Sequence, residues 1–70
     1  MENKFGERLK ALMEEKEYTL KKVADGIQST PTTVSYWING KRQPTADNIL
    51  AVAEFFGVST DYLLGRSEYR

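Results

Sequence analysis

One stretch of this 70-residue chain, residues 31–39, has side chains suited to hydrogen bonding but no acidic or basic residue, although charged residues make up 29% of the chain. At about 100° per residue, a helix here gathers four polar side chains on one side: Thr32, Ser35, Tyr36 and Asn39. Hydroxyl, phenol and amide groups can pair with base edges in the major groove of DNA, where phosphates would repel a carboxylate. The stretch therefore predicts a base-reading helix. The alternative is a short, capped, partly buried helix that simply needs no charge.

Four cations flank this stretch in the sequence: Lys21, Lys22, Lys41 and Arg42. With Asp25 as the one acid, residues 19–43 carry a net charge of +3 within a chain whose net charge is zero. Lys21 and Lys22 fall in the first turn of a predicted helix, where a positive charge is unfavourable because it opposes the helix dipole. Each lysine costs roughly a few tenths of a kcal/mol, and an anion bound nearby would make its placement favourable instead. We expect all four cations to contact phosphates, although solubility alone explains any one of them.

The composition excludes several classes of site. The chain contains no cysteine and no histidine, so disulfides, thiolate or imidazole metal sites and the usual general base are all absent. Neighbouring acids such as Glu14 and Glu15 point about 100° apart on a helix and cannot share a substrate. No stretch approaches the ~20 apolar residues of a membrane span, and residues 1–4 lead into an amphipathic pattern rather than an apolar signal region. We therefore expect a cytoplasmic, non-enzymatic protein with no metal, cofactor or membrane association.

Five helices and no strand are predicted, over residues of about 4–16, 20–27, 31–39, 46–56 and 60–64. Their starts are marked by residues that favour the N-cap position: Asn3, Thr19, Thr30, Thr45 and Ser59. Pro31 suits the first helical position after its cap. Three glycines suit the left-handed position that ends a helix: Gly40, Gly57 and Gly65. The prediction is a single all-α domain over residues 1–65, with residues 66–70 as a tail or the start of a linker.

Apolar residues recur every three or four positions in the predicted helices, which marks the face of each helix that packs inward. These predicted core residues are Phe5, Leu9, Leu12, Met13, Leu20, Val23, Ala24, Ile27, Val34, Trp37, Ile38, Ile49, Val52, Ala53 and Phe56. Ala24 is small where the third helix must cross the second closely. Leu50 and Leu64 lie off these stripes, and we assign them to the core because a small domain has little else to fill its interior. For Phe55 and Tyr62 two alternatives remain: a place in the core or a place on a dimer surface.

Residues 19–44 resemble the helix-turn-helix of the phage repressor and Cro-type, or XRE-like, transcriptional regulators. The matching pattern is T-x-x-x-V-A-x-x-I, a turn, and then T-V-S-x-W-x-N-G-K-R-x-P. The resemblance extends over residues 5–10 before it and residues 53–65 after it, and so covers nearly the whole chain. It implies a compact five-helix, lambda-repressor-like DNA-binding domain that acts as a sequence-specific transcriptional regulator of the phage or prophage repressor type.

The resemblance also implies a role for individual residues of the third helix and of the loop after it. Bases would be read by Pro31, Thr32, Ser35 and Tyr36. Phosphates would be contacted by Thr33, Asn39, Lys41 and Arg42, in addition to Lys21 and Lys22. Such regulators bind as two-fold dimers to near-palindromic operators with half-sites ~34 Å apart. Double-stranded DNA and a second copy of the chain are therefore the expected partners, although the isolated domain could be a monomer.

Three departures from the family pattern bear on the detailed readout. Leu20 replaces a glutamine that braces a phosphate and a base-reading side chain, Gln28 replaces a glycine in the turn, and Pro31 displaces a side chain that usually reaches a base. A left-handed non-glycine residue in the turn would cost about 1 kcal/mol. The zero net charge and the loss of the glutamine at Leu20 leave a second hypothesis, a protein-interaction module on the same fold, such as an antitoxin or an antirepressor partner. Partner binding that survives high salt, without retention of DNA, would identify it.

Overall fold

A computed structural model describes residues 4–70, and these fold into five α-helices without a strand. The helices are α1 (Phe5–Lys16), α2 (Leu20–Gly26), α3 (Pro31–Ile38), α4 (Ala46–Phe56) and α5 (Thr60–Leu63). Each end lies within one residue of the predicted boundary, so the predicted all-α, five-helix fold is confirmed. Across residues 4–70 no helix is long and apolar enough to cross a membrane.

Hydroxyl side chains cap four of the five helices, as predicted: Thr19, Thr30, Thr45 and Ser59. Each hydroxyl oxygen accepts a hydrogen bond from the backbone N–H three residues later, at 3.0–3.2 Å. At α4 the Asn48 side chain accepts the Thr45 N–H in return, which completes a capping box. The cap predicted at Asn3 lies outside the described residues, and Lys4 makes no side-chain bond at the start of α1.

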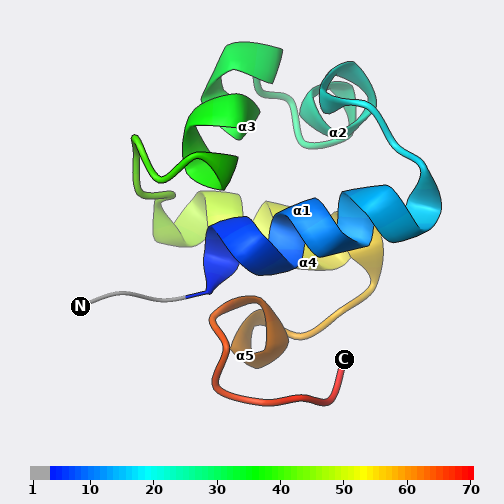
Figure 1. Ribbon diagram of the computed structural model, residues 1–70, viewed down its shortest axis with the longest axis vertical. Coiled ribbons are helices and arrows are strands. Elements are labelled where there is room, and N and C mark those ends of the chain that lie inside the picture. Colours follow the sequence, from blue (N-terminus) through cyan, green and yellow to red (C-terminus); the bar gives the residue numbers. More distant parts are fainter. Residues whose placement is uncertain (1–3) are drawn as a thin grey trace.

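The core forms around α1, which crosses the middle of the molecule with α2 and α3 on one side of it and α5 on the other (Figure 1). The buried residues are Phe5, Leu9, Leu12, Met13, Val23, Ala24, Val34, Trp37, Val52, Ala53, Tyr62 and Leu63. Phe5 meets Trp37 edge to face, with 5.7 Å between ring centroids. The remaining predicted core residues, Leu20, Ile27, Ile38, Ile49 and Phe56, are half-buried against this cluster. The helical stripes read from the sequence therefore identify the core.

Two leucine assignments need correction. Leu50 is 54% exposed, because the inner side of α4 is already occupied by the stripe that contains Val52 and Ala53, and Leu50 lies outside that stripe. Leu64, also assigned to the core, is only half-buried, whereas Leu63 is fully buried in its place. A helix of four residues is too short for a periodicity argument, which explains why Leu63 was missed.

The two aromatic residues that the sequence left open both pack inward. Phe55 is half-buried and lies against Phe56, with ring centroids 5.1 Å apart, and against Tyr18 at 5.6 Å. Tyr62 is buried to 7% exposure, and its ring lies between two guanidinium groups, those of Arg8 at 4.4 Å and Arg70 at 5.5 Å. Both rings therefore contribute to packing within the domain.

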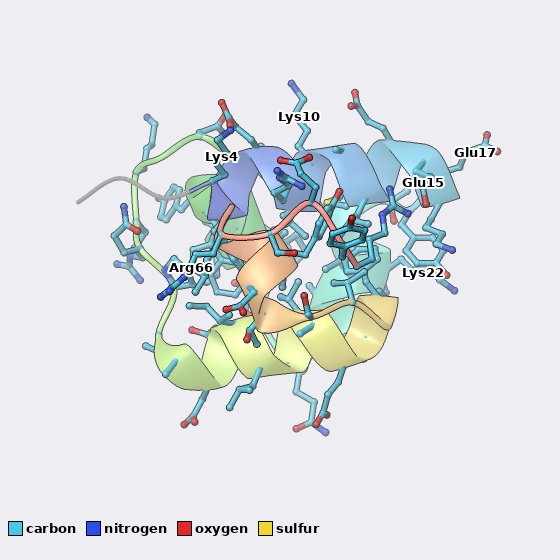
Figure 2. The ribbon with its side chains drawn as sticks, turned by 90° about the horizontal axis from the view of Figure 1, so that it is seen from below. Lys4, Lys10, Glu15, Glu17, Lys22 and Arg66 are labelled. Atoms are coloured by element: carbon cyan, nitrogen blue, oxygen red, sulfur yellow. The ribbon has the colours of Figure 1, made fainter. Side chains whose placement is uncertain are left out.

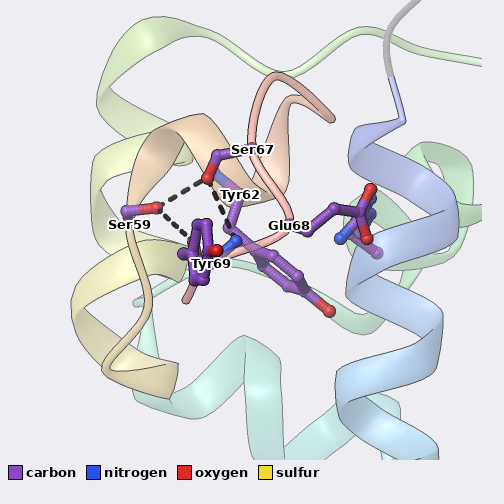
Figure 3. Close-up of polar contacts among 6 residues, drawn as sticks. Ser59, Tyr62, Ser67, Glu68 and Tyr69 are labelled. Atoms are coloured by element: carbon purple, nitrogen blue, oxygen red, sulfur yellow. Dashed lines mark hydrogen bonds and ion pairs between the residues drawn. The ribbon is translucent and has the colours of Figure 1, made fainter.

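Residues 66–70 contain no helix and fold back towards α1 and α5 (Figure 3). The Ser59 N–H donates to the Arg70 carbonyl at 2.8 Å, and the Arg70 guanidinium donates to both carboxylate oxygens of Glu15, at 2.7 Å for one of them. Arg8 also pairs with Glu68 at 3.0 Å. These polar contacts tie the last residues to the helices, while the division into a domain over 1–65 and a tail or linker from 66 stays a prediction.

Glu15 should make the stability of the fold depend on pH. The hydrogen bond from Arg70, followed by its positive charge, holds the pKa of Glu15 below its ordinary value of 4.5. A carboxyl group whose pKa is lower in the folded state than in the unfolded state stabilises the fold at any pH above its unfolded-state pKa. This stabilisation is lost as the pH falls through the folded-state pKa. In denaturant unfolding, Glu15→Gln should lower the unfolding free energy at neutral pH, and the difference from wild type should shrink below pH 4.5. Glu14→Gln, an exposed neighbour, is the control; an E15Q difference that is independent of pH would contradict the assignment.

Gly6 sets how closely α1 approaches α3. A Cβ atom at this position would lie 2.5 Å from the backbone carbonyl oxygen of Trp37, a shorter distance than Cβ atoms show in proteins. A backbone oxygen cannot move away by a side-chain rotation, so the clash could be relieved only if the helices shift. Overpacking of this kind costs roughly 1–3 kcal/mol, more than the gain in helix propensity of up to about 1 kcal/mol. Gly6→Ala should therefore lower the denaturant midpoint, whereas Glu7→Ala, on the exposed side of the same turn, should leave it nearly unchanged. An unchanged midpoint for G6A would show that the two helices can separate freely.

Candidate nucleic-acid interface

The connection between α2 and α3 is a tight turn closed by backbone hydrogen bonds. The Ser29 N–H donates to the Ala24 carbonyl at 2.8 Å and the Gln28 N–H donates to the Asp25 carbonyl at 3.4 Å, the pattern of a helix that ends in a left-handed residue. That residue is Gln28, with φ 59°, so the left-handed conformation, whose cost was given only conditionally from the sequence, is present. Thr30 then caps α3, and Pro31 occupies its first turn.

One side of α3 packs against the rest of the protein and is buried. Val34 is 0% exposed and Trp37 is 3% exposed, and both belong to the core. On the opposite side Pro31 and Thr32 are exposed and Tyr36 is 38% exposed. The predicted division of α3 into an apolar inner side and an uncharged outer side is therefore confirmed. Ser35, which was also placed on the outer side, is half-buried.

Two pairs of polar side chains on α3 bond to each other. The Thr30 hydroxyl donates to the Thr33 hydroxyl at 2.9 Å, and the Asn39 amide donates to the Ser35 hydroxyl at 3.2 Å. Within residues 4–70 the hydroxyls of Thr32 and Tyr36 make no hydrogen bond, so these are the groups on α3 most ready for an outside partner. Thr33 is half-buried and Asn39 is exposed, and their predicted contacts with phosphates stay a prediction.

The end of α3 turns the chain back along the helix. Gly40 adopts φ 73°, its N–H donates to the Trp37 carbonyl at 3.3 Å, and the Lys41 N–H donates to the Tyr36 carbonyl at 2.8 Å. This turn brings the guanidinium of Arg42 to 5.6 Å from the centre of the Tyr36 ring. Lys41 and Arg42 are both exposed, so two cations lie immediately beside the uncharged side of α3.

The two lysines of α2 have partners near their own helix. The Lys21 ammonium donates to the Asp25 carboxylate at 2.8 Å, a bond that raises the pKa of Lys21, although both side chains remain mostly exposed. The Lys22 ammonium lies 5.1 Å from the centre of the Tyr18 ring. In Figure 2 Lys22 lies at the same end of the molecule as Glu17. The predicted phosphate contacts of α2 are therefore exposed, and of the two lysines it is Lys21 whose charge is partly compensated, by Asp25.

Figure 1 shows α3 between α2 and the loop over residues 40–45, so the two groups of cations lie on elements to either side of it. Sequence reasoning missed two local pairs within this arrangement. The spacing of four residues between Lys21 and Asp25 on one helix is a known signal for an ion pair and could have found the first. The second, between Tyr36 and Arg42, depends on the turn at Gly40 and has no comparable signal.

Two short helices joined by a tight turn, the second with one sealed and one uncharged exposed side, define a helix-turn-helix domain. The model of the helix-turn-helix family matches residues 9–63, and the chain belongs to that family. The HTH-type transcriptional regulator ImmR of Bacillus subtilis (strain 168) is 35% identical over 64 residues, which cover 91% of this chain and 50% of ImmR. The chain thus spans about half the length of this relative.

Solved structures share the fold. A crystal structure of the P22 c2 repressor in complex with a synthetic operator matches with a TM-score of 0.84 at 24% identity, over 90% of this chain and 96% of that chain. A structure of FeII HppE in complex with substrate matches with a TM-score of 0.80 at 28% identity, over 91% of this chain but only 37% of that one. The same fold therefore serves in proteins of different kinds, and function has to be argued from the site.

The strain in the turn before α3 can be measured. Gln28 has a left-handed backbone, which costs a side chain about 1 kcal/mol relative to glycine. Gln28→Gly should therefore raise the free energy of unfolding, by up to about 1 kcal/mol. Ser29→Gly is the matched control, because Ser29 lacks a positive φ and glycine there only adds freedom to the unfolded chain. Destabilisation by both substitutions would mean that position 28 is not strained.

Proposed function

We propose that this chain binds double-stranded DNA at a specific sequence and regulates transcription, as a repressor of the phage or prophage type, with α3 in the major groove. One observation carries the proposal: an exposed helix side without charge lies next to two exposed cations. Phosphates attract cations on either side of the groove, whereas the floor of the groove presents donors, acceptors and thymine methyl groups. The family membership, the name of ImmR as a transcriptional regulator and the operator complex of the P22 c2 repressor support the same conclusion.

In this proposal the residues of α3 divide into two groups. Bases are read by Pro31, Thr32, Ser35 and Tyr36. Phosphates are contacted by Thr33, Asn39, Lys41 and Arg42, and from α2 by Lys21 and Lys22. The exposure of Thr32 and Tyr36 and their unused hydroxyls favour them as the principal readers. Pro31 has no N–H to donate, so its part in readout is limited to apolar contact, for example with a thymine methyl group.

The proposal extends to the assembled complex. A two-fold dimer on a near-palindromic operator, with half-sites ~34 Å apart, is the arrangement that places two such helices in successive major grooves. Action on DNA also implies a cytoplasmic protein that needs neither a cofactor nor catalysis, because recognition requires only hydrogen bonds, apolar contact and neutralised phosphates. The other candidate, a protein-interaction module, is favoured by the zero net charge and by Leu20, which stands where the family often has a glutamine that braces a phosphate.

Selection of duplexes from a random pool tests the proposal. We expect one motif to be enriched, with two half-sites separated by about one helical turn of DNA, and binding that weakens steeply with salt. Lys41→Ala should weaken binding to every duplex by a similar factor and lower the salt slope by about 1, because it removes one phosphate contact. Lys10→Ala, an exposed lysine of α1, is the matched control and should leave binding unchanged. If no motif is enriched, specific readout is wrong; retention of a protein partner at high salt would favour the interaction module instead.

A further inference from the structure

We propose that Arg42 is a positioning residue for sequence readout: its guanidinium holds the ring of Tyr36 in place on the outer side of α3, and so helps to decide which base pair is preferred. This inference rests on the proposed function and assigns a role beyond phosphate contact. The underlying observation is that the Arg42 guanidinium carbon lies 5.6 Å from the centre of the Tyr36 ring.

The backbone brings these two side chains together. Tyr36 lies in the last full turn of α3, and the left-handed Gly40 reverses the chain so that the Lys41 N–H reaches the Tyr36 carbonyl at 2.8 Å. The residue that follows this bond is Arg42, and it is therefore held next to the ring by the hydrogen bonds that end the helix. Nothing lies within 4 Å of a Cβ built on Gly40, so it is the backbone conformation and not crowding that requires glycine there.

Arg42 is free to act on the ring because nothing else engages its charge. Within residues 4–70 it forms no ion pair, in contrast to Lys21, which Asp25 compensates. An arginine side chain stacked near a phenol is attracted to the face of the ring, and exposed pairs of this kind favour the contact roughly two- to fivefold. Tyr36 is 38% exposed, so its ring is accessible from the outer side of α3.

The consequence concerns preference among sequences rather than affinity alone. A phenol that reads a base edge can discriminate only if it returns to one orientation, because hydrogen-bond geometry is directional. Loss of the guanidinium should release the ring and weaken discrimination at the base pair that Tyr36 contacts. Lys41, the adjacent cation, has no ring contact within residues 4–70 and should affect all sequences equally.

The experiment compares four variants with wild type on a panel of duplexes, each carrying one base-pair change in the selected motif: R42A, K41A, Y36A and the double variant Y36A/R42A. Thermal unfolding of each variant confirms that it folds. We expect Y36A and R42A to lose discrimination at the same base pair, R42A by roughly two- to fivefold. K41A should lower affinity without changing the order of preference. In the Y36A background, R42A should change preference no further.

Three outcomes would overturn the inference. R42A could behave as K41A does, with a uniform loss across the panel; R42A and Y36A could affect different base pairs; or R42A could change preference equally with and without Tyr36. These results are distinct from failure of the proposed function, which would already be evident if wild-type protein enriched no motif. A wild type that selects a motif, combined with any of the three outcomes, contradicts only the coupling between Arg42 and Tyr36.

Discussion

The arrangement of this protein depends on how α3 is anchored against α1. Val34 and Trp37 are sealed in the core, Trp37 meets Phe5 edge to face at 5.7 Å, and Gly6 lets the backbone of α1 approach the Trp37 carbonyl. Because Val34 and Trp37 face inward, Thr32 and Tyr36 on the other side of α3 face outward, and no side chain of α3 carries a charge. The exposed side of the helix is therefore a direct consequence of the packing on its buried side.

Left-handed residues at both ends of α3 determine how the chain enters and leaves it. Gln28 turns the chain into the helix at a conformational cost, and Gly40 turns it out again without one. The second turn places Arg42 beside Tyr36, while the first joins α2, where Lys21 is paired with Asp25, to α3. Lys41 and Arg42 form no ion pair within residues 4–70, whereas Lys21 is paired with Asp25, and the net charge of zero conceals this local excess of positive charge beside α3.

Much of this could be predicted from the sequence, because helix caps and apolar periodicity are local signals. The hydroxyl caps and the buried side of α3 were predicted correctly for that reason. The predictions for Leu50 and Leu64 were wrong because which apolar residue fills the interior is decided by packing between helices, and α5 is too short to show a period. The contact of Arg70 with Glu15 joins residues far apart in the chain, and no pattern of spacing announces it.

The central claim, that the uncharged side of α3 is the surface that meets DNA, is tested most directly by amide chemical-shift mapping with a duplex recovered by selection. The account predicts that the largest shift changes, on addition of this duplex, fall on α3 and on the loop that follows Gly40. Amides of α5 and of residues 66–70 should change little. The account would be contradicted if the duplex bound with its largest changes on α4 or α5 while the amides of Thr32 to Tyr36 stayed in place.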